Sequence, residues 1–393
     1  MGRRERRGED AQRANGENVS MKYTLCITQK CNLNCRYCYI KKKDVVMPLR
    51  VAQDVLQFMF RHTPSDEKIE VGYFGGEPLL EFDLIEKITD EIERNPQFSS
   101  ERVKLSLVTN GTLFSKRIAR FIQAHDFVMC LSCDGPPRVQ DLSRRFPDGS
   151  GSSAIVLANI RKYLDTGCYV LVNAVYGPET LAFLPETIRF FSSLGLRQIY
   201  INPDYSASWA VPDVDRVVKV YSKVGELYSE FQLSGDPHFI SLIDSKIALI
   251  LRGGYKLQER CRMGRGEFGF APSGNVYPCE RLIGGDNGLD HCIGTIKAIA
   301  RSEGLKDVPL AGNANVECQK CGLADYCMNW CGCSNYFSSG NYYKAGPFLC
   351  ASEKASIIVA YEVFARLQDQ LGPRFADHAA GLTHSFLISR TLV

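Results

Sequence analysis

Three cysteines close together near the start of the chain could hold a metal centre on one loop. They are Cys31, Cys35 and Cys38, in the spacing C-x3-C-x2-C. Three thiolates at this spacing can ligate three irons of a [4Fe–4S] cubane and leave the fourth iron open to a small molecule. A closed zinc site needs a fourth ligand, and no Cys or His follows nearby, while Cys26 falls inside a strand pattern. We therefore predict a catalytic cluster with one open iron on this loop.

A second set of cysteines occupies residues 261–350. The set consists of Cys261, Cys279, Cys318, Cys321, Cys327, Cys331 and Cys350, with Gly274 between the first two in the pattern C-x12-G-x4-C and the next four in the pattern C-x2-C-x5-C-x3-C. A zinc ribbon would use two paired knuckles of two-residue spacing, and this pattern contains one. The whole chain has 16 cysteines and no secretory pattern, which favours metal ligation in a reducing cytoplasm over a disulfide scaffold.

Composition excludes several classes of protein. The net charge of +3 on 393 residues is too small to indicate a nucleic-acid partner. No apolar run reaches the roughly 18 residues of a membrane span, so we expect no membrane association and a cytoplasmic location. The hydrophobic and charged fractions, 45% and 23%, are typical of a globular protein.

The cysteines and other polar motifs need elements that position them. Strand-like runs are predicted at Tyr23–Thr28, Ile69–Phe74, Val103–Thr109, Phe127–Ser132, Cys168–Val175 and Gln198–Asn202. Helix-like runs between and after them are predicted at Leu49–Phe60, Leu84–Arg94, Ser115–Ala124, Ala154–Leu164, Leu181–Leu194, Val214–Gln232, Phe239–Leu251 and Ser352–Leu371. This alternation indicates an α/β fold with a parallel sheet, either doubly wound or curled into a partial barrel.

Each polar motif falls where a predicted strand ends. Cys31 follows the first strand, and the other motifs are Gly75-Gly76-Glu77-Pro78, Thr109-Asn110-Gly111, Ser132-Cys133-Asp134-Gly135, Asn173 and Asn202-Pro203-Asp204. In both forms of parallel α/β fold the chemistry takes place at the carboxyl ends of the strands. We therefore expect these motifs to meet in one site.

With these motifs, residues 22–350 resemble the radical S-adenosylmethionine (SAM) superfamily. The resemblance implies a partial (β/α)6 TIM-like barrel, with Tyr37 in the aromatic position between the last two cluster cysteines and close to the adenine. It implies that the Gly75-Gly76-Glu77-Pro78 backbone and Glu77 receive the methionine ammonium. Ser132 and Asp134 would contact the ribose. Arg144, or its neighbour Arg145, would pair with the SAM carboxylate, and Asn173 would contact the adenine or carboxylate side.

The rear cysteines are similar to the SPASM domain, the auxiliary-cluster module of peptide-modifying radical SAM enzymes. The resemblance implies three [4Fe–4S] clusters, one of them binding SAM. One auxiliary cluster would be held by Cys318, Cys321, Cys327 and Cys350, and the other by Cys261, Cys279 and Cys331. The fourth ligand of the latter stays open between Cys292, Cys333 and an open or substrate-bound iron. We expect Cys26, Cys130, Cys133 and Cys168 to be core residues.

Five segments are predicted along the chain. They are a disordered basic tail (1–20), the partial barrel (21–235), a linker helix (236–260), the auxiliary-cluster domain (261–351) and a C-terminal helix with a tail (352–393). The fourth segment is rich in Gly, Asn and Cys and has few apolar runs. We therefore expect it to bury little core and to depend on cluster ligation for its stability.

The resemblance implies reductive cleavage of SAM to a 5′-deoxyadenosyl radical, which takes hydrogen from a peptide or protein side chain. The predicted function is maturation of a ribosomally made peptide, with a reductant such as flavodoxin or ferredoxin and a separate peptide-recognition protein. The alternatives are anaerobic sulfatase maturation by formylglycine formation and, outside catalysis, a multi-cluster electron-transfer protein.

Two carboxylates are candidates for the catalytic base. Sulfatase maturases carry an Asp directly after the cysteine that corresponds to Cys279, and this chain has Glu280 there. Asp204, after the sixth strand, is the second candidate. The departure at Glu280 is the reason why the peptide-maturase hypothesis is preferred to the sulfatase-maturase hypothesis.

Overall fold

The computed structural model describes residues 20–256, 259–300, 305 and 316–389. Of the predicted basic tail, Ser20 alone falls within these residues. Among them no helix is long and apolar enough to cross a bilayer.

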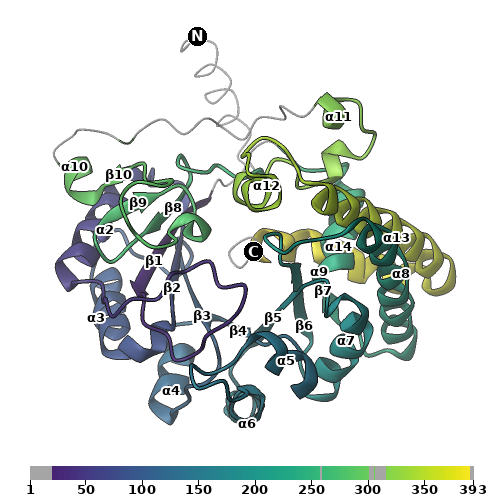
Figure 1. Ribbon diagram of the computed structural model, residues 1–393, viewed down its shortest axis with the longest axis horizontal. Helices are drawn as coiled ribbons and strands as arrows, with labels where there is room; N and C mark the ends of the chain where they lie inside the picture. The colour runs from purple at the N-terminus through teal and green to yellow at the C-terminus, as the bar shows by residue number, and fades with distance from the viewer. Residues whose placement is uncertain (1–19, 257–258, 301–304, 306–315, 390–393) are drawn as a thin grey trace.

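One ten-stranded sheet organises the molecule, in the order β10-β9-β8-β1-β2-β3-β4-β5-β6-β7. The strands are β1 (Ser20–Thr28), β2 (Lys68–Gly75), β3 (Val103–Thr109), β4 (Val128–Ser132), β5 (Val170–Tyr176), β6 (Gln198–Pro203), β7 (Phe239–Ile240), β8 (Glu267–Phe270), β9 (Asn275–Tyr277) and β10 (Gly294–Thr295). Strands β1 to β7 pair in parallel, each with the next. Figure 1 shows them in an arc with helices outside, which confirms the predicted α/β partial barrel.

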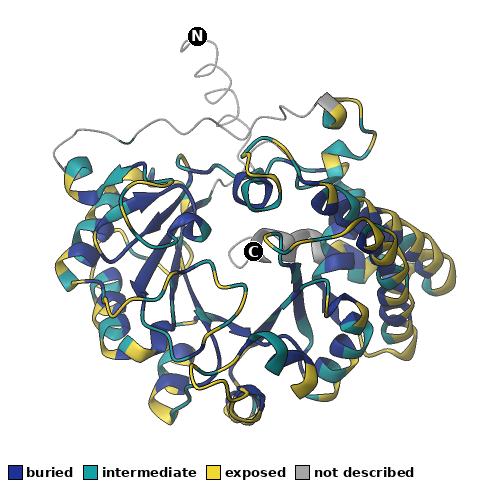
Figure 2. Cartoon of the chain, viewed as in Figure 1, coloured by how far each residue is buried: buried dark blue, intermediate teal, exposed yellow. Residues whose placement is uncertain are grey.

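The helices between the strands cover the outer face of this arc. They are α2 (Leu49–His62), α3 (Phe82–Glu93), α4 (Lys116–Ala124), α5 (Pro137–Ser143), α6 (Ser153–Asp165), α7 (Leu184–Ser193) and α8 (Val211–Ser234), with short 3-10 helices η1 (Pro78–Glu81) and η2 (Leu181–Phe183). In α2, Val51, Val55 and Met59 recur at the spacing of one helix face and are buried. Figure 2 shows the same division, with buried ribbon toward the sheet and exposed ribbon outside.

Two local features differ from the sequence prediction. Helix α5 was not predicted, because its seven residues are too short to show a repeated helical period. The run Phe239–Leu251 was predicted as one helix, but its first two residues form β7, and α9 begins at Ser241 and ends at Arg252. The two residues of β7 extend the sheet beside β6.

The first part of the rear segment belongs to the barrel sheet. Strand β8 pairs in parallel with β1, and β9 and β10 continue the sheet in antiparallel pairs. Phe268 and Phe270 are buried and stack on Tyr23 of β1. The expectation that residues 261–350 bury little core was therefore wrong for this part, because strands of two to four residues are too short to reveal a period.

In the part of the chain that the structure describes, five more α-helices follow β10, and the first of them packs against α2. They are α10 (Ile296–Ala300), α11 (Val316–Gln319), α12 (Gly332–Ser339), α13 (Pro347–Leu371) and α14 (Pro373–Ser389). The 3-10 helix η4 (Glu280–Leu282) precedes them, and η5 (Ala324–Tyr326) lies between α11 and α12. Helix α13 packs against α8 and α9, and α14 packs against α9. The chain thus ends in two helices where one was predicted, since Gly372 leaves the helical conformation and Pro373 starts a new helix.

Candidate active site

The carboxyl ends of β1 to β6 surround a cavity, here called the front cavity. Its walls include Cys31, Cys35, Cys38, Tyr37, Gly75, Gly76, Asn110, Ser132, Arg144, Asn173, Asn202, Pro203, Asp204, Tyr205 and Arg281. Motifs from six strand ends therefore meet in one place, as the sequence predicted. Parallel strands bring this about because all their carboxyl ends lie at the same edge of the sheet.

The three front cysteines lie on the loop after β1 with their thiols free. Asn110 Nδ2 lies 3.7 Å from Cys31 Sγ, and the Leu33 N–H donates to the same sulfur at 3.4 Å. Backbone hydrogen bonds from Asn34 to Arg145 (2.5 Å) and from Arg36 to Ser143 (3.1 Å) hold the loop to the end of α5 and the segment that follows it. Three thiols facing one cavity, with polar N–H groups beside a sulfur, fit a cluster with an open iron.

Gly75 and Gly76 let the end of β2 approach the cysteine loop. A Cβ at Gly76 would lie 2.1 Å from the Lys30 carbonyl oxygen, and one at Gly75 would lie 2.3 Å from the Thr28 carbonyl oxygen. Gly75 also has φ +154°, which residues with side chains rarely adopt. A side chain at either position would therefore collide with the cysteine loop, and the two glycines also form part of the cavity wall.

Glu77 is placed differently from the expectation. Its side chain is fully buried, and its carboxylate accepts hydrogen bonds from Thr109 Oγ1 (2.8 Å), Asn110 N (2.7 Å) and Leu79 N (3.1 Å). Burial raises its pKa to about 7, although these three hydrogen bonds act in the opposite direction. Glu77 therefore ties the end of β3 to the loop after β2, and Pro78 begins η1 behind it. The carboxylate lies outside the cavity wall.

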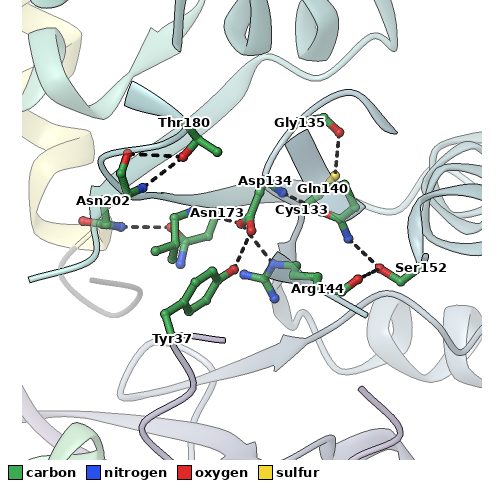
Figure 3. Close-up of polar contacts among 12 residues, drawn as sticks. Tyr37, Cys133, Asp134, Gly135, Gln140, Arg144, Ser152, Asn173, Thr180 and Asn202 are labelled. Carbon is green, nitrogen blue, oxygen red and sulfur yellow. Dashed lines mark hydrogen bonds and ion pairs between the residues drawn. The ribbon is translucent and has the colours of Figure 1, made fainter. Parts of the chain in front are cut away.

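Asp134 is the centre of a buried polar group. Its Oδ1 accepts from Arg144 Nε (3.0 Å) and from the Val175 N–H (3.0 Å), and its Oδ2 accepts from the Tyr37 hydroxyl (2.6 Å), as Figure 3 shows. The Arg144 guanidinium also lies 5.3 Å from the Tyr37 ring centroid. Tyr37 and Arg144 line the cavity, whereas Asp134 lies behind them and orients both.

The structure distinguishes the two candidate arginines. Arg144 lines the front cavity, while Arg145 is exposed and donates to the backbone oxygens of Asp141 and Gly149. Asn173 lines the cavity too, and its Oδ1 accepts from Asn202 Nδ2 at 2.9 Å. Figure 3 shows these two amides beside the Asp134 group.

A second cavity, here called the rear cavity, adjoins the first. Cys261, Cys279, Cys331 and Cys333 line it, together with Lys246, Glu267 and Glu353. Asn202, Pro203, Tyr205 and Arg281 line both cavities and form a shared wall. The strand-end residues that resemble SAM-binding motifs thus lie on one side of this shared wall, and the rear cysteines lie on the other side.

The two candidate bases have different positions. Asp204 lines the front cavity, and its Oδ1 accepts from the backbone N–H and the hydroxyl of Ser206. Glu280 is buried outside both cavity walls, and its Oε1 lies 3.4 Å from Lys22 Nζ. Burial opposes its ionisation, but Lys22 and neighbouring donors outweigh burial and hold the pKa of Glu280 below its usual value. Its neighbour Arg281 lines both cavities.

The structure also brings together the predicted ligands of the other auxiliary cluster. Cys321 follows Cys318 in a tight turn, and Cys350 lies in the first turn of α13. Burial and the nearby Cys350 and Cys321 raise the pKa of Cys318. A buried ion pair, Lys246 Nζ to Glu353 Oε2 at 2.7 Å, joins α9 to α13 beside them.

Tyr205 and Arg281 were missed by sequence reasoning. Each is adjacent to a residue that was considered, Asp204 and Glu280 respectively. Tyr205 lines the front cavity together with Asp204, whereas Arg281 faces the cavities in place of Glu280. The sequence could not show this, because turn geometry decides which of two neighbours points inward.

Comparison with known proteins agrees with this geometry. Residues 25–191 match the family model of the radical SAM superfamily. Among relatives, the chain is 29% identical to the uncharacterized protein MJ0907 of Methanocaldococcus jannaschii over 276 residues, covering 66% of this chain and 85% of the relative. It is 24% identical to the radical SAM cyclopropyl synthase TigE of Paramaledivibacter caminithermalis, covering 78% and 66%. It is 23% identical to the cysteine-type anaerobic sulfatase-maturating enzyme of Clostridium perfringens strain 13, covering 77% and 85%.

Solved structures show the same fold. The structure of anSMEcpe with bound AdoMet has a TM-score of 0.75 at 19% identity and covers 94% of this chain and 98% of that one. Streptococcus suis SuiB bound to its precursor peptide SuiA has a TM-score of 0.58 at 16% identity, covering 88% and 80%.

The family implies a [4Fe–4S] cluster and SAM, and the loop of Cys31, Cys35 and Cys38 fits that cluster. The alternative of a non-catalytic electron carrier is set aside, because the matched family and the relatives named for an activity are enzymes. With its strand-end motifs gathered in one cavity, this chain is an enzyme with a radical SAM domain in residues 25–191, similar in sequence to anaerobic sulfatase-maturating enzymes and in fold to anSMEcpe and SuiB.

Proposed function

We propose that this enzyme modifies a ribosomally made peptide, using SAM at the front cavity and two auxiliary clusters behind it. The observation that carries the proposal is the wall shared by the front and rear cavities. A substrate side chain at Asn202, Tyr205 and Arg281 would lie between the SAM-motif residues and the rear cysteines.

The chain's own residues would bind and orient SAM. The backbone of Gly75 and Gly76 offers carbonyl groups for the ammonium, and Arg144 offers a guanidinium for the carboxylate. Ser132 and Asn173 lie on the same wall for the ribose and adenine. When bound, the cluster and SAM would supply a 5′-deoxyadenosyl radical in this cavity.

The rear residues support removal of an electron from the substrate. One set of cysteines lines the rear cavity, and Cys318, Cys321, Cys327 and Cys350 form a second set outside the lining of that cavity. Auxiliary clusters on both sets would pass the electron onward, and a flavodoxin or ferredoxin would reduce the front cluster. A separate small protein would deliver the precursor peptide.

Asp204 is the preferred base where the reaction needs one. It lines the front cavity, whereas Glu280 is paired with Lys22 outside it. Asp204→Asn should therefore lower product formation much more than Glu280→Gln, with iron content and SAM cleavage as controls that both variants still fold and load clusters.

Sulfatase maturation is the second candidate function. The match to anSMEcpe spans nearly the full length of both chains, and one of its structures holds the Cp18Cys peptide as well as AdoMet. This hypothesis predicts formation of an aldehyde from Cys or Ser in a sulfatase-derived peptide.

The test uses anaerobically reconstituted enzyme with SAM and a chemical reductant. About twelve irons per chain and release of 5′-deoxyadenosine are expected. Replacing Cys31, Cys35 and Cys38 with Ala should leave about eight irons and abolish the nucleoside. Candidate peptides encoded beside the gene, and sulfatase peptides for comparison, are then analysed by mass spectrometry. Zinc without iron, or 5′-deoxyadenosine from the triple variant, would refute the proposal.

A further inference from the structure

The rear cavity brings a fourth thiol to the three predicted ligands of the first auxiliary cluster. Cys261 precedes β8, Cys279 follows β9, and Cys331 is the N-cap of α12. Cys333, in the first turn of α12, lines the same cavity as these three. Three separate segments therefore converge on one group of four sulfurs.

Distances place Cys333 within this group. Its Sγ lies 3.6 Å from Cys331 Sγ, and its side chain is in hydrogen-bonding contact with Cys279. Cys333 is 4% exposed and Cys279 is 3% exposed, so both thiols face the interior of the protein. Cys333 thus shares one cavity with the three predicted metal ligands, which a cysteine serving only as a small core residue need not do.

The other spare cysteine, Cys292, lies elsewhere. Its Sγ contacts the Gly294 carbonyl oxygen at 3.2 Å, and it packs against a separate small apolar cluster that contains Cys26, Ile40 and Tyr277. Cys292 is outside the rear cavity wall. The structure therefore separates two residues that sequence spacing alone left equivalent.

Carboxylates are the rival ligands. Within the described part of the chain, the ligand atoms of Glu267, Cys279 and Glu280 lie within 4.8 Å of one another. However, Lys22 Nζ lies 3.3 Å from Glu267 and 3.4 Å from Glu280, so each carboxylate already has a buried cationic partner. Thiolate is also the ligand that iron–sulfur clusters take by preference.

We propose that Cys333 is the fourth protein ligand of the auxiliary cluster held by Cys261, Cys279 and Cys331. The inference rests on the proposed function in assuming that this cluster is present. With four thiolates the cluster is closed, so it transfers electrons and does not bind the substrate through an iron. The substrate must then be held by other groups at the shared wall, of which Arg281 is the charged one.

The test measures the cluster rather than turnover. In the background with Cys31, Cys35 and Cys38 replaced by Ala, only auxiliary clusters remain. Cys333→Ala and, as a matched control, Cys292→Ala are reconstituted anaerobically, and iron is counted before and after mild oxidation. We expect Cys333→Ala to lose about one iron and to give the EPR signal of a [3Fe–4S] cluster, since a site without its cysteine ligand is labile. Cys292→Ala should match the parent.

Further variants keep the proposal falsifiable if Cys333→Ala fails to fold. Cys333→Ser retains the size of the side chain and an oxygen ligand, so it should fold and shift the EPR spectrum of the reduced cluster. Spectra of Cys333→Ser and Cys333→Ala that match the Cys292→Ala control would overturn the assignment. Iron loss in Glu267→Gln but not in either Cys333 variant would overturn it in favour of the carboxylate. Failure of the wild type to cleave SAM would refute the proposed function but leave these iron counts interpretable.

Discussion

At the scale of single residues, two buried acids organise the site without facing it. The Glu77 carboxylate accepts hydrogen bonds at the end of β3 and so ties it to the loop after β2. The Asp134 carboxylate accepts hydrogen bonds from Tyr37 and Arg144. The cavity wall is instead formed by glycine backbone, the Arg144 guanidinium and small polar side chains. Such supporting groups fix the orientation of the residues that touch the ligand.

Asp134→Asn should weaken both the fold and SAM binding. The substitution leaves the Arg144 cation buried without its anionic partner, and breaking a buried pair in this way costs about 3 kcal/mol. Loss of Arg144 orientation should raise the Kd for SAM by about tenfold. Thermal unfolding and equilibrium binding of SAM test this, with the exposed Asp148→Asn as control. Equal Kd values for the two variants would contradict the positioning role.

Glu77 predicts a pH-dependent stability. Its folded-state pKa of about 7 lies above the unfolded value near 4.3, so its contribution to stability is fully present below about pH 4 and is lost as pH rises through 7. Between about pH 6 and pH 8, the wild type should therefore lose about 1 kcal/mol of unfolding free energy relative to Glu77→Gln, which cannot ionise. Denaturant unfolding at several pH values measures the difference. Parallel pH profiles would show that Glu77 does not titrate in this range.

At the scale of elements, the rear segment divides into two parts with different sources of stability. Residues 267–277 add strands to the barrel and bury Phe268 and Phe270 against Tyr23. Residues 316–350 consist of short helices and turns that carry five of the predicted ligands. The first part is held by sheet hydrogen bonds and apolar burial. We expect the second part to depend much more on metal ligation.

Removal of iron should therefore loosen one part and spare the other. After anaerobic chelation, amide hydrogen exchange should rise by at least tenfold in residues 316–346 and stay nearly unchanged in β8. Strand β3, in the centre of the barrel sheet, serves as the internal reference. A rise of the same size in β8 would mean that the whole rear segment needs its clusters to fold.

At the scale of the whole molecule, two cavities lie on opposite sides of one shared wall. The front cavity is formed by barrel strand ends, and the rear cavity is formed by α9, α12, α13 and the loops around β8 and β9. Figure 1 shows α12 lying across the open side of the arc of strands. Cys331 and Cys333, at the start of this helix, line the rear cavity. Arg281 reaches both cavities from η4.

Arg281→Gln should uncouple SAM cleavage from modification of the substrate. The variant should still produce 5′-deoxyadenosine, because the SAM-motif residues are untouched, but product should fall at least tenfold as the substrate loses its charged contact. The ratio of product to 5′-deoxyadenosine measures the coupling, and iron content shows whether the clusters are intact. Arg265→Gln, an exposed arginine of the same segment, is the control. An unchanged ratio would remove Arg281 from the substrate site.

The sequence by itself determined the fold class, the strands of the barrel and the motifs at their ends. It could do so because long amphipathic helices and buried strands repeat with a clear period, and because cysteine spacing constrains metal ligation. Tertiary structure alone decided that β8 pairs with β1 and that Glu77 and Asp134 lie behind the wall of the front cavity. It also decided that Arg281 faces the cavities in place of Glu280. Finally, it placed Cys333 beside Cys331 and left Cys292 outside the rear cavity. The physical reason is that these outcomes depend on contacts between segments far apart in the chain and on which side of a short strand or turn a residue faces, neither of which leaves a local pattern.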